Sequence, residues 1–182
     1  GARRFDYDKE VCKPNCSLPH MMPSRELFQE KVQALGINNE SDIVVYDDVG
    51  LYASPRAWWM FRAMGHERVW ILNGGLRAWL EAGQDVVAGH ATAASSGNFT
   101  AAEGAARFCD APFVLDSLDD DRSQVLDARS AGRFNGTAPE PRPGVRGGHM
   151  PSSKNLPFPE VLDGITLKNA AELERILAPL AS

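Results

Sequence analysis

The nucleophilic side chains of this chain are three cysteines, Cys12, Cys16 and Cys109. Cys12 and Cys16 are separated by three residues in a predicted loop, so this pair could form a disulfide, bind a metal or sense oxidation. The spacing matches half of a zinc site, but no second cysteine pair accompanies it. Reduced, free thiols are therefore the default expectation, and neither a metal nor an organic cofactor is predicted.

Two arginines, Arg133 and Arg142, lie in a Pro- and Gly-rich segment and could bind a planar anion. A guanidinium group donates two parallel hydrogen bonds, which match the geometry of a carboxylate. From composition alone, both are more simply surface arginines, because exposed arginine is the normal case. The acidic run at residues 119–121 is most simply a solvated turn, since carboxylates adjacent in sequence rarely converge on a metal.

The elements that would position these side chains are clearest in residues 41–83, where strand and helix patterns alternate. Residues 43–46 form an apolar, β-branched run that predicts a strand buried on both faces. Pro55 suits the first turn of a helix, and residues 69–72 predict the next strand. This βαβα order predicts an α/β fold with a central parallel sheet flanked by helices.

Two amphipathic helices are predicted, one in each half of the chain. Ser24 suits the N-cap of a helix with Phe28 and Val32 on one face. Asn169 and Glu172 match a capping box ahead of a second apolar stripe. The segments that precede these helices, GARRFDYD and SSKNLPFP, align loosely. The chain is therefore predicted to contain an internal repeat at an offset of one domain.

Two longer blocks resemble a known family. VVYD, SPRAWWMFRAMGH and VWILNGGLRAWLEAG resemble the non-catalytic N-terminal domain of the tandem rhodanese family, and in particular its mercaptopyruvate and thiosulfate sulfurtransferases. Residues 125–158, VLDARSAGRFNGTAPEPRPGVRGGHMPSSKNLPF, resemble the start of the second domain, where the family usually reads D-x-R, R-F, E-P-R and G-H-I-P-G-A. Two long blocks in the same order are more specific than any single short motif.

The resemblance implies two tandem rhodanese-like copies, both incomplete. Residues 1–84 are interpreted as a non-catalytic N-terminal domain whose start is missing, and residues 85–123 as an interdomain linker. Residues 124–182 are interpreted as the first half of a C-terminal domain, without its active-site loop. We therefore expect the sequence to begin partway through the first domain and to stop partway through the second.

The resemblance also implies a reaction. In this family a cysteine thiolate takes a sulfane sulfur from 3-mercaptopyruvate or thiosulfate as a persulfide and passes it to cyanide or to a thiol, such as a small thiol or a thioredoxin-like protein. The cysteine lies in a C-G-S-G-x-T loop whose backbone N–H groups stabilise the anion. No cysteine here lies in such a loop, and Asp47 holds the corresponding place in the first copy. We therefore expect neither the nucleophilic cysteine nor the ring of backbone N–H groups around it, here called the cradle. We predict that this polypeptide alone is inactive.

The same resemblance assigns roles to the two arginines. Arg133 in GRFNG and Arg142 in EPRPG match the residues that bind the carboxylate and carbonyl of mercaptopyruvate in the family. Thiosulfate-preferring relatives often lack the second arginine. The presence of Arg142 therefore favours mercaptopyruvate as the sulfur donor.

Asp8 and His20 are the predicted proton relay. FDYD and SLPHMMPS resemble the segment that carries the Asp and His of a Ser-His-Asp relay in the family, with the serine in the missing loop. A histidine oriented by a carboxylate transfers protons near neutral pH, which suits protonation of the enolate left after sulfur removal. Two alternatives stay open: Asp6 could replace Asp8, and His20 could be a loop histidine tied to nearby backbone.

Composition describes an ordinary globular chain of 182 residues with a net charge of -5. This balance does not indicate a nucleic-acid partner, and no apolar run approaches the roughly 20 residues of a membrane span. A cytoplasmic location is expected, with a mitochondrial one open. Two other hypotheses remain: a non-catalytic rhodanese-like module that binds a partner, and a single permuted domain built from residues 1–84 and 122–182.

Overall fold

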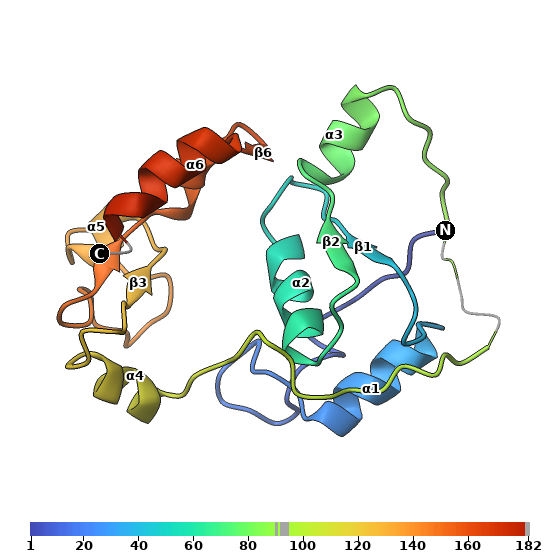
Figure 1. Ribbon diagram of the computed structural model, residues 1–182, viewed down its shortest axis with the longest axis horizontal. Coiled ribbons are helices and arrows are strands. Elements are labelled where there is room, and N and C mark those ends of the chain that lie inside the picture. The colour runs from blue at the N-terminus through green and yellow to red at the C-terminus, as the bar shows by residue number, and fades with distance from the viewer. Residues whose placement is uncertain (90, 92–94, 181–182) are drawn as a thin grey trace. The chain divides into compact units, whose positions relative to one another are not determined.

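The computed structural model of the chain describes residues 1–89, 91 and 95–180 (Figure 1). The chain forms two compact units, residues 1–108 and residues 109–182, rather than one permuted domain. Residues 90 and 92–94, within the segment interpreted as a linker, lie outside the described residues. Each unit is described by itself below.

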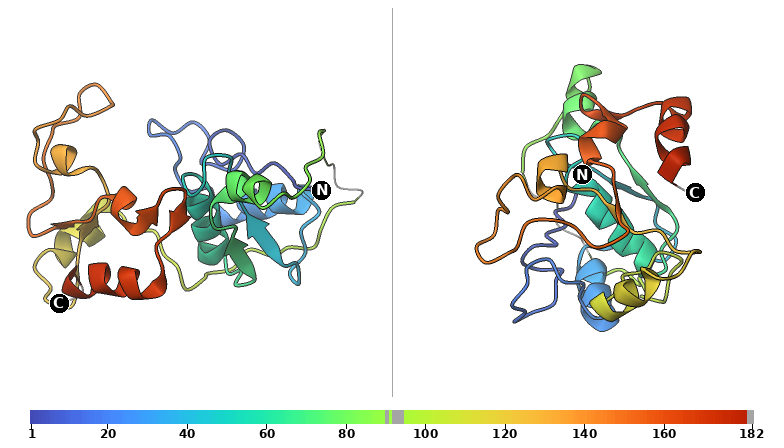
Figure 2. Two further views of the ribbon diagram at one scale, coloured as in Figure 1. Left: turned by 90° about the horizontal axis from the view of Figure 1, so that it is seen from above. Right: turned by 90° about the vertical axis from the view of Figure 1, so that its left-hand side faces the viewer.

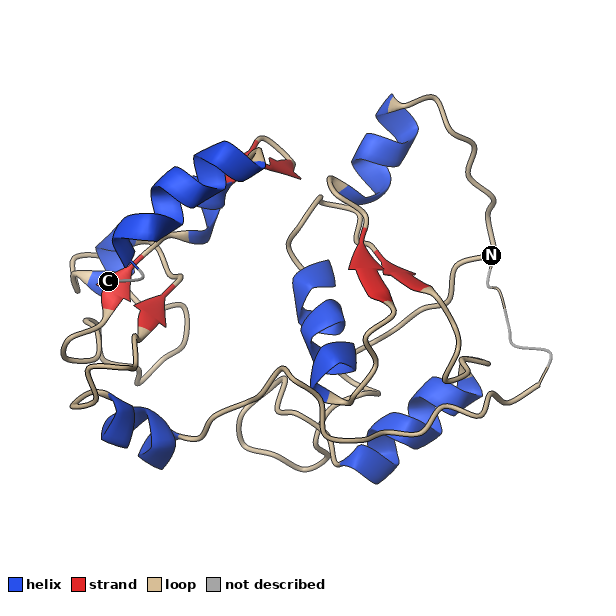
Figure 3. Ribbon diagram, in the orientation of Figure 1, coloured by secondary structure: helices blue, strands red, loops and turns tan. Residues whose placement is uncertain are grey.

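The first unit has the predicted alternation of strands and helices (Figure 3). Its elements are α1 (Arg25–Ala34), β1 (Ile43–Val45), α2 (Ser54–Ala63), β2 (Val69–Ile71) and α3 (Gly75–Glu81). β1 and β2 pair in parallel, with Ile43 opposite Val69 and Val45 opposite Ile71. α2 connects the two strands and packs against both. This is the βαβα arrangement expected from the sequence.

The predicted start of α1 is confirmed. The Ser24 hydroxyl accepts a hydrogen bond from the backbone N–H of Leu27 at 3.2 Å, which satisfies one of the free donors at the helix start. Phe28 and Val32 of α1 are fully buried, as the apolar spacing predicts. This helix therefore presents one apolar face to the core of the first unit.

The core of the first unit joins α1, α2 and β2 to two segments without regular structure. Its buried members are Val11, Phe28, Val32, Met60, Phe61, Met64, Val69 and Phe99. Phe99 lies inside the segment interpreted as a linker, yet its side chain is only 1% exposed. The backbone N–H of Gly97 donates to the carbonyl of Gln33 at 2.8 Å. This part of the segment thus packs on α1.

The expectation that the first strand is buried on both faces is wrong. Val44 is 57% exposed and the next strand exposes Trp70, whereas Val69 is buried. Side chains alternate between the two faces of a strand, and α2 covers only one face of this two-stranded ladder. The apolar run therefore marks a strand but not burial of both faces.

The second unit is built from shorter elements. They are α4 (Ala111–Ser117), β3 (Leu126–Asp127), α5 (Ala131–Phe134), β4 (Lys154–Asn155), η1 (Phe158–Val161), β5 (Leu162–Asp163), β6 (Thr166–Leu167), α6 (Ala170–Leu177) and η2 (Ala178–Leu180). β3 and β4 are parallel, and β5 and β6 are antiparallel. Among the described residues, parallel pairing is thus limited to two separate two-stranded ladders and does not extend into one central sheet.

The predicted capping box begins α6, the red helix in Figure 2. The backbone N–H of Glu172 donates to the Asn169 side chain at 3.0 Å, and the backbone N–H of Asn169 donates back to the Glu172 carboxylate at 3.4 Å. Two free donors at the helix start are thereby satisfied reciprocally. The start of this helix is therefore confirmed as predicted.

Candidate functional site

Asp8 and His20, the predicted relay residues, lie in contact in the first unit. The Asp8 Oδ1 atom is 2.6 Å from the His20 Nδ1 atom, and the two side chains are 52% and 45% exposed. Contact with Nδ1 directs the other ring nitrogen, Nε2, away from the carboxylate, where it is available for proton transfer. The structure thus brings together the two residues that sequence reasoning paired.

Neighbouring groups hold the His20 backbone and ring. A guanidinium nitrogen of Arg56, from α2, donates a hydrogen bond to the His20 carbonyl oxygen. The Tyr7 ring meets the imidazole edge-on, with ring centroids 6.1 Å apart. These contacts were not anticipated from the sequence, because Arg56 is distant in the chain. They orient a histidine that would otherwise lie in a free loop.

Asp6, the alternative partner of His20, has a different role. Its carboxylate lies 2.7 Å from Arg4 and accepts the backbone N–H groups of Asp8 and Lys9, each at 3.1 Å. Desolvation opposes ionisation here, but the N–H groups and Arg4 outweigh it and lower the pKa of Asp6 below its ordinary value. Asp6 therefore shapes the turn that presents Asp8.

Arg133 is held by a carboxylate in the second unit. Its Nε and Nη2 atoms donate to Oε2 of Glu140 at 3.1 and 2.6 Å. Oε1 of the same carboxylate accepts Nη1 of Arg129 at 2.8 Å. The Glu140 side chain is 5% exposed and its arginine partners are 28% and 31% exposed, so Glu140 lies at the centre of a partly buried network that joins α5 to the loop after it. Arg133 is therefore fixed in orientation.

The network continues to the end of β3. Arg129 donates to both carboxylate oxygens of Asp127 and to the carbonyl of Gly148 at 2.7 Å. The hydrogen bonds from Arg129 lower the pKa of Asp127, and those from Arg133 lower the pKa of Glu140, despite the opposing effect of desolvation. Two carboxylates and two guanidinium groups thus neutralise each other, as buried charge requires.

Arg142 differs from Arg133 in that it has no internal partner. It is exposed in the loop that follows Glu140, and its side chain makes no ion pair or hydrogen bond with other residues in the described part of the chain. The structure therefore does not pair Arg142 with Arg133. Of the two predicted substrate arginines, one is held in place and the other is free to bind an anion.

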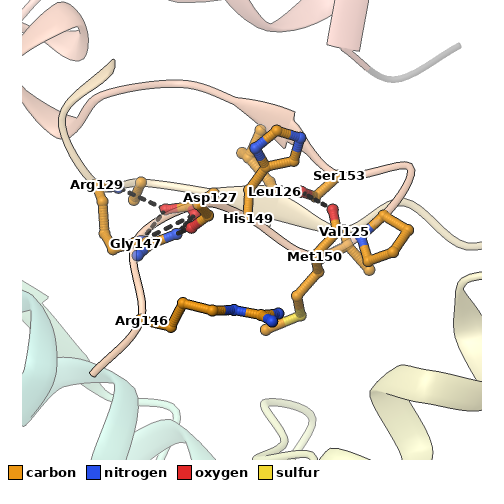
Figure 4. Close-up of a pocket in the computed structure, with 12 residues that line it drawn as sticks. Val125, Leu126, Asp127, Arg129, Arg146, Gly147, His149, Met150 and Ser153 are labelled. Carbon is orange, nitrogen blue, oxygen red and sulfur yellow. Dashed lines mark hydrogen bonds and ion pairs between the residues drawn. The ribbon is translucent and has the colours of Figure 1, made fainter. Parts of the chain in front are cut away.

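A cavity of about 760 Å³ lies beside β3 in the second unit (Figure 4). Its lining includes Asp127, Arg129, Arg146, His149 and Met150. Figure 4 shows the Asp127–Arg129 contacts at this cavity, with the Arg146 side chain extended along it. Neither Arg133 nor Arg142 lines this cavity. The predicted substrate arginines and the cavity are thus separate features of the unit.

Asp47 lies within a ring of donors at the N-terminus of α2. One carboxylate oxygen accepts the backbone N–H groups of Tyr52, Ala53 and Ser54 at 2.9 to 3.0 Å, together with the Ser54 hydroxyl at 2.9 Å. The other oxygen accepts the N–H of Val49 at 3.0 Å. The expectation that the chain lacks such a cradle is therefore wrong for the first unit.

The cradle stabilises an anion, and the Asp47 carboxylate is that anion. Desolvation would raise the pKa of Asp47, but the hydrogen bonds from Ser54, Ala53 and Val49 outweigh it and lower that pKa. Backbone N–H groups at a helix start carry partial positive charge, so they stabilise a carboxylate as they would a thiolate. Asp47 thus occupies the ring of donors with its own carboxylate.

Sequence reasoning missed the roles of Glu140, Arg129, Asp127 and Asp47 as anchors. Asp127 and Arg129 form the D-x-R motif and Glu140 begins the E-P-R motif, but the sequence pattern assigns none of these three residues a role. An acid and an arginine two residues apart at the end of a strand are a usable signal for an ion pair. The contact from Glu140 back to Arg133 has no such local signal.

Other site types receive no support from the described residues. In residues 1–89, 91 and 95–180, no group of three or more His, Cys, Asp or Glu side chains is arranged to hold a metal ion. Within the same ranges, no helix combines the length and apolar character needed to cross a membrane. The three cysteines are not joined in disulfides.

Comparison with known proteins places these features in a family. The family model for the rhodanese-like domain matches residues 15–82. The chain is 41% identical over 189 residues to 3-mercaptopyruvate sulfurtransferase of Rattus norvegicus, covering 97% of this chain and 60% of the relative. It is 40% identical over 196 residues to thiosulfate/3-mercaptopyruvate sulfurtransferase 1, mitochondrial, of Arabidopsis thaliana, covering 94% of this chain and 50% of the relative.

A solved structure gives the same result. The crystal structure of SseA from Escherichia coli, described as a 3-mercaptopyruvate sulfotransferase, superposes with a TM-score of 0.86 at 34% identity, covering 100% of this chain and 67% of that chain. The chain thus spans 50 to 60% of the two curated relatives above and two thirds of this structure. Fold and sequence agree over nearly all of its residues, and the chain belongs to the rhodanese family, with 3-mercaptopyruvate sulfurtransferases among its relatives.

Proposed function

We propose that this chain takes part in the transfer of sulfur from 3-mercaptopyruvate to a thiol acceptor. The observation that carries the proposal is Arg142, which is exposed and makes no side-chain pair among the described residues, in the same unit as the Arg133 that Glu140 holds in place. A free guanidinium donates two hydrogen bonds to a carboxylate. Mercaptopyruvate carries a carboxylate and thiosulfate does not, so mercaptopyruvate is the favoured donor and thiosulfate the second.

In the proposed reaction a cysteine thiolate attacks the sulfur of mercaptopyruvate. The carbon–sulfur bond breaks, the cysteine keeps the sulfur as a persulfide, and the enolate of pyruvate leaves. The enolate takes a proton to give pyruvate, and the persulfide passes its outer sulfur to a thiol. Arg142, with Arg133, binds the carboxylate and carbonyl in this scheme, which opposes the negative charge that develops on the enolate.

Asp8 and His20 are the proposed proton relay. The contact of Asp8 with Nδ1 fixes the ring and leaves Nε2 for proton transfer. In this orientation Nε2 faces away from the Asp8 carboxylate, so it can deliver a proton to the enolate or to a hydroxyl group that bridges to it. The role is proposed for the pair, because Asp8 orients the imidazole ring and His20 carries the proton.

We further propose that the two units derive from tandem rhodanese-like copies, a non-catalytic domain at 1–84 and the opening of a catalytic domain at 124–182, joined by residues 85–123. The Asp47 carboxylate in its cradle supports a non-catalytic first copy, because a carboxylate cannot form a persulfide. It also favours a second candidate function for this unit, that of a binding module. The acceptor is proposed to be a small thiol or a thioredoxin-like protein.

These 182 residues are proposed not to turn over substrate by themselves, because none of Cys12, Cys16 and Cys109 follows a strand into a helix-capping loop. The test is a pyruvate-release assay with mercaptopyruvate and a thiol, on protein whose intact mass matches 19.8 kDa. No pyruvate release is expected. Persulfide formation on a polypeptide of that mass would contradict this part of the proposal.

The donor itself is tested by binding, which does not need the nucleophile. Mercaptopyruvate and thiosulfate are titrated separately into isotope-labelled chain, and amide and guanidinium signals are followed by NMR. Saturable shifts with mercaptopyruvate, and weaker ones with thiosulfate, are expected. Equal responses to the two anions would remove the preference for a carboxylate donor. Cytoplasm is the proposed compartment, with mitochondria the alternative suggested by the name of the Arabidopsis relative.

A further inference from the structure

Cys12 and Cys16 lie within the loop that the Asp8–His20 pair closes. The Asp8 carboxylate meets His20 at 2.6 Å, and the backbone N–H of Lys13 donates to the carbonyl of Met21 at 2.9 Å. The loop is therefore held near its ends by two separate contacts. Both cysteines are partly exposed to solvent.

A tight turn lies between the two cysteines. Pro14 and Asn15 form a turn, and Asn15 has a φ of 53°, in the left-handed region. Proline followed by a residue of positive φ is the pattern of a turn that reverses the chain and brings its first and last residues, here Lys13 and Cys16, to within about 7 Å. A disulfide requires Cα atoms roughly 4.4 to 6.8 Å apart. Cys16 ends this turn and Cys12 immediately precedes its first residue, so the two cysteines lie on either side of the same reversal of the chain.

The two cysteines differ in how firmly they are held. Val11, next to Cys12, is 3% exposed in the core of the first unit, and its N–H donates to the carbonyl of Asp6 at 2.9 Å. Cys16 follows the turn in a segment without regular structure. Cys16 is therefore the less constrained of the two cysteines, and movement on its side of the turn brings the sulfurs together.

Cys12 is directly connected to the relay. Its Sγ atom lies 3.2 Å from the carbonyl oxygen of Asp8, to which the thiol donates a hydrogen bond. Asp8 is the residue whose carboxylate orients His20. Conversion of the thiol to a disulfide removes this donor, because the sulfur then carries no proton. The oxidation state of Cys12 is therefore coupled to the backbone position of Asp8.

We propose that Cys12 and Cys16 form a reversible disulfide under peroxide, and that this oxidation alters the Asp8–His20 pair. One thiolate attacks a peroxide oxygen, the O–O bond breaks, and a sulfenic acid and water form. The second thiol attacks the sulfenic sulfur, the S–O bond breaks, and a second water leaves. Two thiols and one hydrogen peroxide thus give one disulfide and two waters, and an added dithiol reverses the change.

The modification is tested by thiol counting and peptide mass. The reduced chain is treated with equimolar hydrogen peroxide, and the peptide that contains both cysteines is analysed. The expected result is loss of two thiols and of the mass of two hydrogen atoms from that peptide, with Cys109 unmodified. C16S is expected to prevent this change, and C109S, the matched control, to leave it intact. Pairing with Cys109, or sulfinic acid without a disulfide, would overturn the proposal.

The coupling to the relay is tested on the same samples by ¹⁵N NMR of the histidine rings. The His20 signals are expected to shift on oxidation, to return with dithiothreitol, and to remain unchanged when C16S is treated in the same way. An unchanged His20 spectrum in chains that contain the disulfide would refute the coupling. Neither readout depends on sulfur transfer, so failure here is distinct from failure of the proposed function.

Discussion

The guanidinium group of Arg133 donates two hydrogen bonds to a single carboxylate oxygen of Glu140, at 3.1 and 2.6 Å. Because Glu140 is nearly buried and also binds Arg129, Arg133 cannot swing freely toward solvent. One predicted substrate arginine is therefore oriented by the protein before any ligand binds. Such preorganisation reduces the entropy lost on binding.

Replacing Glu140 is expected to release Arg133. In E140Q one of the two carboxylates that neutralise Arg129 and Arg133 is lost, Asp127 alone remains as a counter-charge, and the second unit should unfold at a lower temperature. Hydrogen exchange at the Arg133 Nε–H should become faster, since its acceptor is weaker. E174Q, at an exposed position of α6, is the matched control and should change neither quantity. Unaltered exchange in E140Q would contradict the assigned role.

Replacing Asp47 is expected to destabilise the first unit. D47A leaves four backbone N–H groups and the Ser54 hydroxyl without their acceptor, and part of this loss is recovered by water. A loss of about 2 kcal/mol in the free energy of unfolding is expected, as for a lost helix cap with further hydrogen bonds. Urea unfolding followed by tryptophan fluorescence measures it. D48A, at the exposed neighbouring residue, should cost far less.

Asp47 also predicts a pH dependence. Its pKa in the folded chain lies below the ordinary value of 3.8, so the unfolded chain binds this proton more readily than the folded one. The resulting stability is fully present above about pH 5 and is lost as the pH falls through the folded pKa. As the pH falls below about 5, the free energy of unfolding of D47N should therefore decrease less than that of the parent chain. Parallel curves for the two proteins would show that Asp47 does not contribute.

The Asp8–His20 pair is expected to orient rather than to stabilise. Both side chains are about half exposed, and even a fully charged pair at such exposure contributes less than about 1 kcal/mol. D8N should leave the melting temperature nearly unchanged and shift the ring nitrogen signals of His20. D6A is the informative comparison, because Asp6 accepts two backbone N–H groups and its loss should lower the melting temperature. A larger decrease in melting temperature for D8N than for D6A would contradict the assignment of Asp8 as the orienting residue and Asp6 as the stabilising one.

Local signals in the sequence predicted local structure well. Ser24 and Asn169 begin their helices as expected, because a cap depends on residues within one turn. The order of β1, α2 and β2 was predicted from the two apolar runs, which mark the strands, and from Pro55, which marks the start of the helix between them. The exposure of one face of β1 was not predicted, because burial depends on which element packs on each face of a strand, and α2 covers one face only.

The candidate site divides in the same way. Asp8 and His20 were paired by resemblance to a family segment, and the structure places them in contact. The hold of Glu140 on Arg133 depends on the course of the loop between them, which no short pattern specifies. The cradle around Asp47 likewise depends on the backbone angles of residues 48–53. Such contacts become visible only when the loop is folded.

The measurement that most directly tests the proposed function is a titration of the labelled chain with pyruvate, a stable carboxylate that lacks the reactive sulfur. Arg142 signals are expected to shift, and R142A should bind about tenfold more weakly or worse, as expected for loss of a charged hydrogen-bonding partner. R146A removes another exposed arginine of the same region and should bind like the parent chain. Equal affinity in R142A and the parent chain would contradict the account.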